Sequence, residues 1–205
     1  MSAPTYAVST ELDAVNQILS SVGQAPVTTL DQENPEVAIV LSTLREVSKQ
    51  VQAEGWIFNT ERNYEFTPDS VTKEIQIPSN VMQLDANLQK HYSAYDPVRR
   101  NGKLYDRISH SFQWSEVVYA DVVWYLDFTD LPPAIQAYVT ARAATMCATK
   151  MVGDKELYTL LGAQEKLTRA TALEYECNQG DYNMFGFRDG ENYYNSYQPF
   201  HALMR

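Results

Sequence analysis

The sequence is poor in cysteine and has no long apolar run. Its two cysteines, Cys147 and Cys177, are too few for the disulfide framework of a small secreted domain. Both fall in predicted helices, and antiparallel packing would separate the two thiols by roughly 27 Å at a rise of about 1.5 Å per residue. No bridge is expected, and a reducing compartment fits. Apolar runs stay below the ~18 residues of a membrane span, and the first residues lack a signal-peptide pattern.

Basic residues are also scarce. The chain carries 16 Lys and Arg against 26 Asp and Glu, which gives a formal net charge of −10. This balance argues against nonspecific binding to the outside of DNA, because such binding needs a basic face. It is compatible with a surface past which DNA slides, since acidic walls repel phosphate.

Catalytic motifs are lacking as well. The histidines His91, His110 and His201 have no partner at metal-ligand spacing. There is no glycine-rich phosphate loop and no G-x-S-x-G elbow. We therefore expect no catalytic residue, no metal ligand and no cofactor.

Paired carboxylates leave one enzymatic alternative. Asp121 with Asp127, or Asp85 with Asp96, could serve a virion-associated glycan hydrolase that uses a carboxylate pair as acid and base. A chain with 26 acidic residues produces such pairs by chance, so we treat this reading as secondary.

Helical patterns occupy both ends of the chain. Thr10 and Asp13 are spaced as a capping pair, and Asn34-Pro35-Glu36 combines a cap, a first-turn proline and an acid. Apolar residues then recur at helical spacing in each segment. The expected caps and stops of the four helices are Thr10 and Gly23, Asn34 and Gly55, Asp130 and Gly153, and Asp154 and Gly180.

The middle of the chain is typical of β-structure. The segments "GWIFNTERNYEFTP", "SVTKEIQIPSNVMQLDA" and "EVVYADVVWYLDF" are rich in aromatic and β-branched residues and predict strands. We expect "VTKEIQI" to be one of them. Asn101-Gly102 predicts a hairpin, because a type I′ turn needs positive φ at both central residues. No internal repeat is evident.

These patterns predict an α+β fold. A four-helix bundle-like domain would comprise residues 1–55 and 129–180, with an antiparallel β-rich insertion at 56–128. Residues 181–205 would form an extended aromatic C-terminal arm.

Two segments are candidate interaction sites. Basic residues flank the predicted hairpin turn and suit an acidic partner surface or the DNA backbone; equally, they could protect a sheet edge from stray pairing. The arm carries seven aromatic side chains that favour ordering on a partner over free solvation. The hairpin residues are Arg99, Arg100, Lys103, Tyr105 and Arg107, and the arm residues are Tyr182, Phe185, Phe187, Tyr193, Tyr194, Tyr197 and Phe200.

Four segments carry a resemblance to a known family. "ELDAVNQILSSVGQAPVTTL", "VQAEGWIFNTE", "LDFTDLPPAIQAYVTARAA" and "EYECNQGDYNMFG" resemble, in order along the chain, the tail tubular protein A family of short-tailed bacteriophages (podoviruses). The resemblance is weakest between residues 79 and 117. Members of that family are head-to-tail adaptors, also called gatekeepers.

The resemblance implies a structural virion protein and no enzyme. It implies a dodecameric ring between the portal protein and the tail nozzle protein (tail tubular protein B), with a central channel through which the genome passes. The implied partners are the portal, the nozzle, other copies of the chain and, more remotely, tail fibres, with DNA passing unbound. The implied location is the short tail at the portal vertex, after assembly in the host cytoplasm. We expect the arm to clasp the portal or a neighbouring subunit.

A third hypothesis is a DNA-binding terminal protein that uses the basic hairpin. The acidic net charge makes it the weakest of the three. The sequence does not indicate which residues line a channel.

Overall fold

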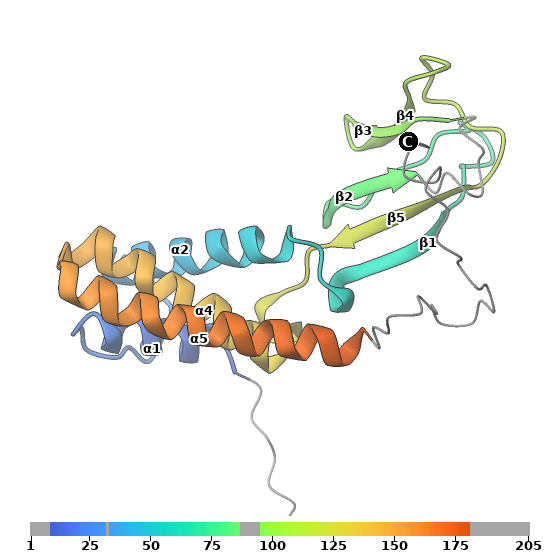
Figure 1. Ribbon diagram of the computed structural model, residues 1–205. Coiled ribbons are helices and arrows are strands. Elements are labelled where there is room, and N and C mark those ends of the chain that lie inside the picture. The colour runs from blue at the N-terminus through green and yellow to red at the C-terminus, as the bar shows by residue number, and fades with distance from the viewer. Residues whose placement is uncertain (1–8, 32, 87–94, 181–205) are drawn as a thin grey trace, which may run out of the picture.

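The computed structural model describes residues 9–31, 33–86 and 95–180. Helices precede and follow a β-rich middle along the chain, and in space the helices lie together at one end of the molecule with the strands at the other (Figure 1). This mixture of helices and antiparallel sheets confirms the predicted α+β class. The helices are α1 (Glu11–Ser21), α2 (Pro35–Gln52), α4 (Pro133–Cys147) and α5 (Lys155–Gln179), and the strands are β1 (Thr60–Phe66), β2 (Val81–Ala86), β3 (Pro97–Arg100), β4 (Lys103–Asp106) and β5 (Val118–Trp124). Short 3-10 helices span Ile57–Asn59 and Phe128–Asp130, and a π-helix spans Ala148–Val152.

Three of the four predicted helix caps are confirmed. The Thr10 hydroxyl accepts a hydrogen bond from the Asp13 N–H, and the Asp13 carboxylate accepts one from the Thr10 N–H, which completes a capping box. Asn34 accepts a hydrogen bond from the N–H of residue 36, two positions on, and Asp154 does the same at the start of α5.

The predicted cap Asp130 is wrong. It ends a 3-10 helix, and α4 begins only at Pro133, with Pro132 in the cap position. The two consecutive prolines explain the delay, because a residue that precedes proline is pushed out of the helical region. Leu131 and Pro132 are accordingly extended, with ψ of 145° and 144°.

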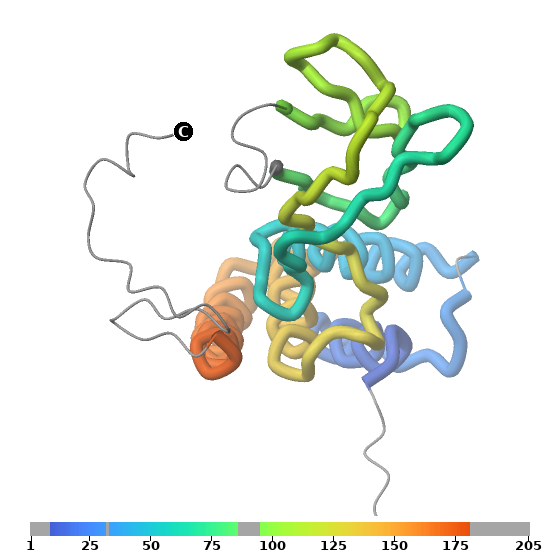
Figure 2. The backbone as a smooth tube through the Cα atoms, turned by 90° about the vertical axis from the view of Figure 1, so that its right-hand side faces the viewer, coloured from blue at the N-terminus to red at the C-terminus, as the bar shows by residue number. Residues whose placement is uncertain are grey.

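The helices share one hydrophobic core. Buried apolar side chains of α1, α2 and α4 meet in it, including Ile18, Leu44 and Ile135. Helix α4 contacts each of the other three helices, and α5 lies along α4. In Figure 2, α5 runs on one side of α4 while α1 and α2 lie on the other. We refer to these helices as the helical part.

The strands form two antiparallel sheets. The larger has the order β1-β5-β2, and β3 pairs with β4. A second hydrophobic cluster, which includes Phe66, Ile75, Leu104 and Trp114, lies among these strands. We refer to residues 60–124 as the β part. How the chain divides into domains stays a prediction.

The predicted strand "VTKEIQI" is wrong. Residues 71–77 make only isolated bridges, Glu74 to Gln113 and Gln76 to Lys103. The side chain of Val71 is 86% exposed, while Ile75 and Ile77 are buried. The reason is local: a turn that begins at Asp69 uses the first half of the segment, so only its second half reaches the sheet.

Buried amides join the two parts. The Gln52 side chain at the end of α2 donates to the Leu126 carbonyl at 3.0 Å and accepts from the Leu126 N–H at 2.8 Å. The Asn59 amide donates to the carbonyls of Gln52 and Trp124, both at 2.9 Å. Because these groups lie in the interior, their hydrogen bonds hold the helical part and the β part in one orientation.

Candidate interaction surfaces

The predicted hairpin is confirmed. Strands β3 and β4 pair with Arg100 opposite Lys103, and the turn residues Asn101 and Gly102 have φ of 51° and 72°. Both values are positive, as a type I′ turn requires.

The cations of the hairpin all have partners within the β part. Arg100 lies over the Tyr105 ring, 4.2 Å from its centroid, and the Tyr105 ring also contacts Phe112. The other contacts are Lys103 Nζ to Glu74 at 2.6 Å, Arg99 Nη1 to the Val81 carbonyl at 2.8 Å, and Arg107 Nε to Asp96 at 3.4 Å. Carboxylates pair with two of the four cations, Lys103 and Arg107. The engagement of all four within the β part favours a structural role over binding of DNA phosphates.

The four aspartates considered for a glycan hydrolase do not form the pairs that the sequence suggested. Asp121 on β5 lies directly opposite Asp85 on β2, and its carboxylate accepts a hydrogen bond from the Asn63 N–H at 2.9 Å. Asp96 faces Arg107, and Asp127 is an exposed residue that precedes a 3-10 helix. The arrangement gives no support to a hydrolase.

The remaining sequence-predicted sites lie largely outside the described residues. The arm residues Tyr182, Phe185, Phe187, Tyr193, Tyr194, Tyr197 and Phe200 are among them, as are His91 and His201. His110 is exposed in a loop of the β part. Within residues 9–31, 33–86 and 95–180, no three His, Cys, Asp or Glu side chains gather as metal ligands. No helix in this portion is both long and apolar enough to cross a membrane.

The cysteines are apart and unbridged, as predicted. Cys147 is buried and Cys177 is exposed, and both are free thiols. Burial raises the pKa of the Cys147 thiol, so this side chain remains a protonated core residue.

A loop that begins at Asp69 was not predicted from the sequence. The Asp69 carboxylate accepts hydrogen bonds from the N–H groups of Val71 and Thr72 at 2.9 and 2.8 Å, and from the Thr72 hydroxyl. Its own N–H donates to the Glu74 carbonyl at 3.0 Å, and Lys73 is left-handed with φ of 58°. The carboxylate thus organises a six-residue loop.

A second loop repeats this design at Asp106. Its carboxylate accepts from the N–H groups of Ile108 and Ser109 at 3.1 and 3.0 Å, and from the Ser109 hydroxyl at 2.6 Å. The Asp106 N–H donates to the Ser111 carbonyl at 2.9 Å, and His110 has φ of 54°. Both loops share the sequence pattern Asp-x-Val/Ile-Thr/Ser, and this pattern could have predicted them from the sequence.

Both loops expose an aliphatic side chain at the same end of the β part. Val71 is 86% exposed and Ile108 is 57% exposed. Residues 75–77 pair antiparallel with residues 102–104, so the chain before the first segment and the chain after the second project in one direction. That direction is away from the helices (Figure 1). Two polar-anchored loops with apolar tips suit a contact surface.

Helix α5 carries four of the exposed large apolar side chains of the described residues, Tyr158, Leu160, Leu167 and Leu173. Only Leu161 and Ala172 are buried among its 25 residues. Leu160 and Leu167 are 70% and 69% exposed. Together with the exposed Ala163 and Ala170, these leucines recur at spacings of three and four, which places them on one helix face. We call these four residues the α5 stripe.

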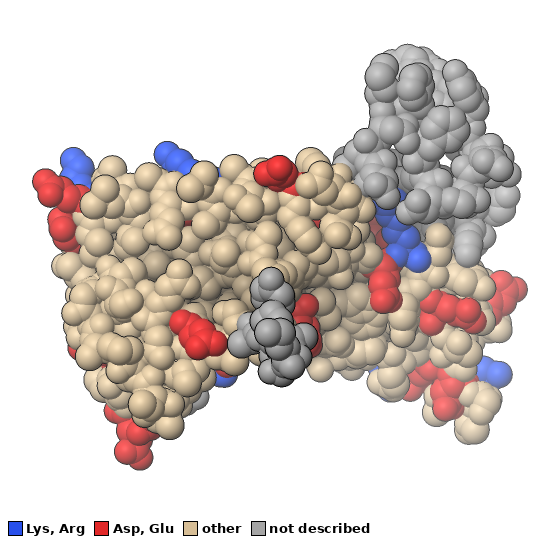
Figure 3. Space-filling model, turned by 90° about the horizontal axis from the view of Figure 1, so that it is seen from below, with Lys and Arg blue, Asp and Glu red and all other residues tan. Residues whose placement is uncertain are grey.

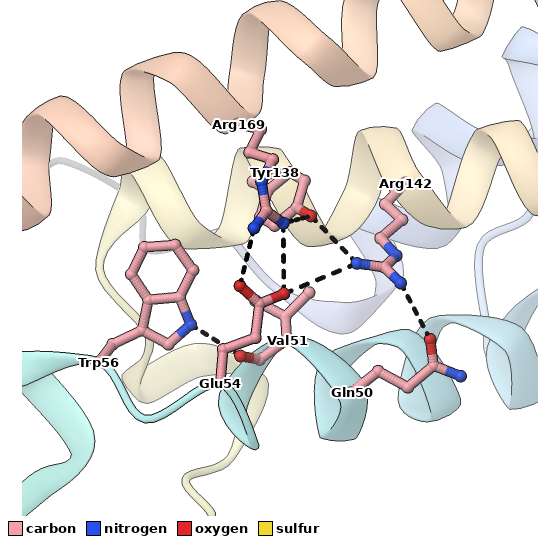
Figure 4. Close-up of polar contacts among 7 residues, drawn as sticks. All are labelled: Gln50, Val51, Glu54, Trp56, Tyr138, Arg142 and Arg169. Atoms are coloured by element: carbon pink, nitrogen blue, oxygen red, sulfur yellow. Dashed lines mark hydrogen bonds and ion pairs between the residues drawn. The ribbon is translucent and has the colours of Figure 1, made fainter.

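An ion pair and its neighbouring hydrogen bonds hold α5 in place, and we call the contact among Glu54, Tyr138, Arg142 and Arg169 the ionic joint. Glu54 accepts hydrogen bonds from both terminal nitrogens of Arg169, at 3.2 and 3.0 Å (Figure 4). The buried Tyr138 hydroxyl accepts from Arg169 and from Arg142, and Arg142 also reaches Gln50. Bidentate geometry makes such a pair directional, so the joint helps to determine which face of α5 points outward.

A second contact anchors the end of α5. Glu176 accepts a hydrogen bond from the Ile57 N–H at 2.8 Å. Burial raises the pKa of its carboxyl, while this hydrogen bond opposes the shift. Helix α5 is therefore attached to the 3-10 helix that precedes the β part as well as along α4.

The outer side of α2 carries a hollow of about 480 Å³. Its floor and rim come from one face of the helix, and Arg45 at its edge makes an ion pair with Glu11 at 2.9 Å. We call this hollow the α2 groove. Its residues are Ala38, Leu41, Ser42, Arg45, Glu46 and Lys49.

Charged side chains are scattered over the helical surface. Figure 3 shows the underside of the molecule, where Lys, Arg, Asp and Glu are separated by a wide surface that carries none of them. No concentrated basic face is visible in that view.

Comparison with known proteins identifies relatives over most of the chain. A family model described as "Tail tubular protein" matches residues 12–182. The curated Tail tubular protein A of Klebsiella phage KP34 is 31% identical over 124 residues, which is 60% of this chain and 62% of the relative. The chain therefore spans about three fifths of the length of that curated relative.

Proposed function

The chain belongs to the tail tubular protein family, and from that premise we propose that it is a structural component of a bacteriophage tail. The observation that carries the proposal is the match of the family over residues 12–182, which includes the described helices and strands almost completely. The relative from a Klebsiella phage agrees with a phage origin.

We propose more specifically that the protein is a head-to-tail adaptor. Twelve copies would form a ring at the portal vertex, with the portal protein on one side and the tail nozzle protein on the other. Other copies of the chain are then its first partners, and tail fibres are more remote ones. The buried hydrogen bonds of Gln52 and Asn59 and the pair between Arg169 and Glu54 support this role. The amide hydrogen bonds hold the helical part and the β part in one orientation, the ion pair holds α5 in place, and an adaptor must keep its two partners in a fixed relative position.

The charge of the chain supports a channel for genome passage. A net charge of −10 repels phosphate, so DNA would pass without being held. The engagement of Lys103 and Arg107 with carboxylates further reduces the cationic surface available to DNA.

The arm at residues 181–205 is proposed as a clasp on the portal or on a neighbouring subunit. It begins where α5 ends, and its aromatic side chains are large anchors of the kind that dominate interface energetics. In a ring the same contact is repeated by each subunit, so modest individual affinities combine.

Electron microscopy of reconstituted assemblies tests the adaptor role. The full chain, portal rings and nozzle protein of the same phage would be mixed in pairs and all together. We expect the chain to decorate one face of the portal ring, and we expect the nozzle to bind only when the chain is present. A nozzle that binds the portal equally well without the chain would contradict the proposal.

A further inference from the structure

We propose that the α5 stripe of one copy packs into the α2 groove of a second copy of the chain. This inference rests on the proposed function, because it names the surfaces through which adaptor subunits would join. It commits to a contact between two different faces of the same protein.

The α5 stripe has the form of an unfilled helix–helix interface. Leu160 and Leu167 lie seven residues apart, with the small residues Ala163 and Ala170 following each of them. Large and small side chains thus alternate along one face, as they do where a helix inserts into the surface of another helix. With both leucines about 70% exposed, a large apolar area remains in water until a partner covers it.

The α2 groove is complementary in shape. The small residues Ala38 and Ser42 lie one turn apart and leave room between the larger side chains around them. Ile39 beside them is 41% exposed and supplies an apolar edge. A hollow of about 480 Å³ along a helix is suited to leucine side chains from a second helix.

Charge complementarity favours the same pairing. Exposed Glu156 lies one turn before Leu160, and exposed Glu174 lies two turns after Leu167, so the stripe has a carboxylate at each end. The groove is lined by Arg45, Lys49 and Glu46. Arg45 pairs with Glu11, and Glu46 pairs with Lys150, so Lys49 is the groove cation that a carboxylate at an end of the stripe would meet.

The positions of the two surfaces predict how copies assemble. Helix α4 separates α5 from α2 (Figure 2), so stripe and groove lie on different sides of the helical part. A contact between different surfaces leaves one stripe and one groove free after each addition, and it closes only as a ring. A contact of stripe with stripe would instead stop at a dimer.

Two variants of the full chain separate these possibilities. Leu167→Asp places a charge in the stripe, and Ser42→Trp fills the groove. Both positions are exposed, so circular dichroism should show intact folding. Tyr158→Asp is the control, because it also places a carboxylate at an exposed apolar position of α5, but two residues before Leu160 and therefore on another face of the helix.

Sedimentation velocity over a wide range of protein concentration is the measurement. We expect the unmodified chain and Tyr158→Asp to form growing oligomers, and each of the other two variants to associate at least tenfold more weakly. An equal mixture of Leu167→Asp and Ser42→Trp should form a heterodimer and stop, because it contains one intact stripe and one intact groove.

Three results would overturn the inference. The first is that Ser42→Trp on its own forms dimers. The second is that the mixture of Leu167→Asp and Ser42→Trp forms no heterodimer. The third is that the unmodified chain stays monomeric at every concentration. Failure here is distinct from failure of the adaptor role: if Leu167→Asp still assembles on portal rings as the unmodified chain does, the adaptor stands and these surfaces do not join it. If the unmodified chain never binds the portal, the adaptor role itself fails.

Discussion

Single buried polar residues determine how the two parts of this molecule meet. Gln52 is fully buried and exchanges two hydrogen bonds with the backbone of Leu126. The substitution Gln52→Leu would leave both backbone groups without these partners. We expect the free energy of unfolding to fall by about 2–3 kcal/mol, because each unsatisfied buried group costs roughly 1–3 kcal/mol. Urea denaturation measures this change.

The exposed Gln50 supplies the control, since it lies on the same helix and makes only two long hydrogen bonds at 3.3 Å, with Arg142 and Glu46. Gln50→Leu should change the unfolding free energy by less than about 0.5 kcal/mol. Equal losses in the two variants would show that Gln52 does not lock the junction.

Asp106 should make stability depend on pH. Burial by itself would raise the pKa of this carboxyl, but hydrogen bonds from Ser109 and from backbone N–H groups lower it below its ordinary value. The folded-state pKa is therefore lower than the unfolded-state pKa, so the stabilisation is present above about pH 4 and is lost as the pH falls through the folded-state value.

The variant Asp106→Asn tests this dependence. We expect its unfolding free energy, followed by urea denaturation from neutral to acidic pH, to decline less on acidification than that of the unmodified chain. The exposed Asp130→Asn is the control. If Asp106→Asn lost stability on acidification as steeply as the unmodified chain, the network around Asp106 would not have the assigned role.

At the scale of elements, two glycines should respond oppositely to the same substitution. Gly102 has φ of 72° in the β3–β4 turn, while Gly162 lies inside α5, and neither would crowd an added methyl group. Gly102→Ala should cost about 1–2 kcal/mol, because L-residues are disfavoured at positive φ. Gly162→Ala should stabilise by up to about 1 kcal/mol through helix propensity. Thermal unfolding of both variants measures the effects, and the same sign in both would refute this explanation.

The sequence predicted elements best where one short motif determines the backbone. The capping pair Thr10 and Asp13 and the turn Asn101-Gly102 were found as expected. Prediction failed where two local signals competed: the prolines after Leu131 overrode the cap at Asp130. In "VTKEIQI" the turn at Asp69 overrode the alternation of apolar residues.

The face that α5 buries was not predictable from its own residues. Its leucines recur at helical spacing, but those at 160 and 167 point to solvent while Leu161 points inward. The contact between Arg169 and Glu54 contributes to the rotation of the helix together with the burial of Leu161 and Ala172, and it joins residues 115 positions apart. Local periodicity carries no information about such a contact.

At the scale of the whole molecule, the basic hairpin shows the same limitation. The sequence presents a cluster of cations, whereas the structure provides Lys103 with Glu74 and Arg107 with Asp96. Glu74 comes from another segment, whereas Asp96 directly precedes β3 and pairs with Arg107 across the hairpin. Carboxylates thus pair with two of the four cations after folding. The assembly surfaces proposed here come instead from exposed apolar side chains.

The measurement that tests the central claim most directly is native mass determination of portal rings mixed with the full chain. The adaptor account predicts one symmetric complex whose added mass equals twelve chains of 23.3 kDa, and weaker or absent assembly when residues 181–205 are deleted. Portal rings that keep their own mass at every salt concentration, beside a chain that stays free, would contradict it.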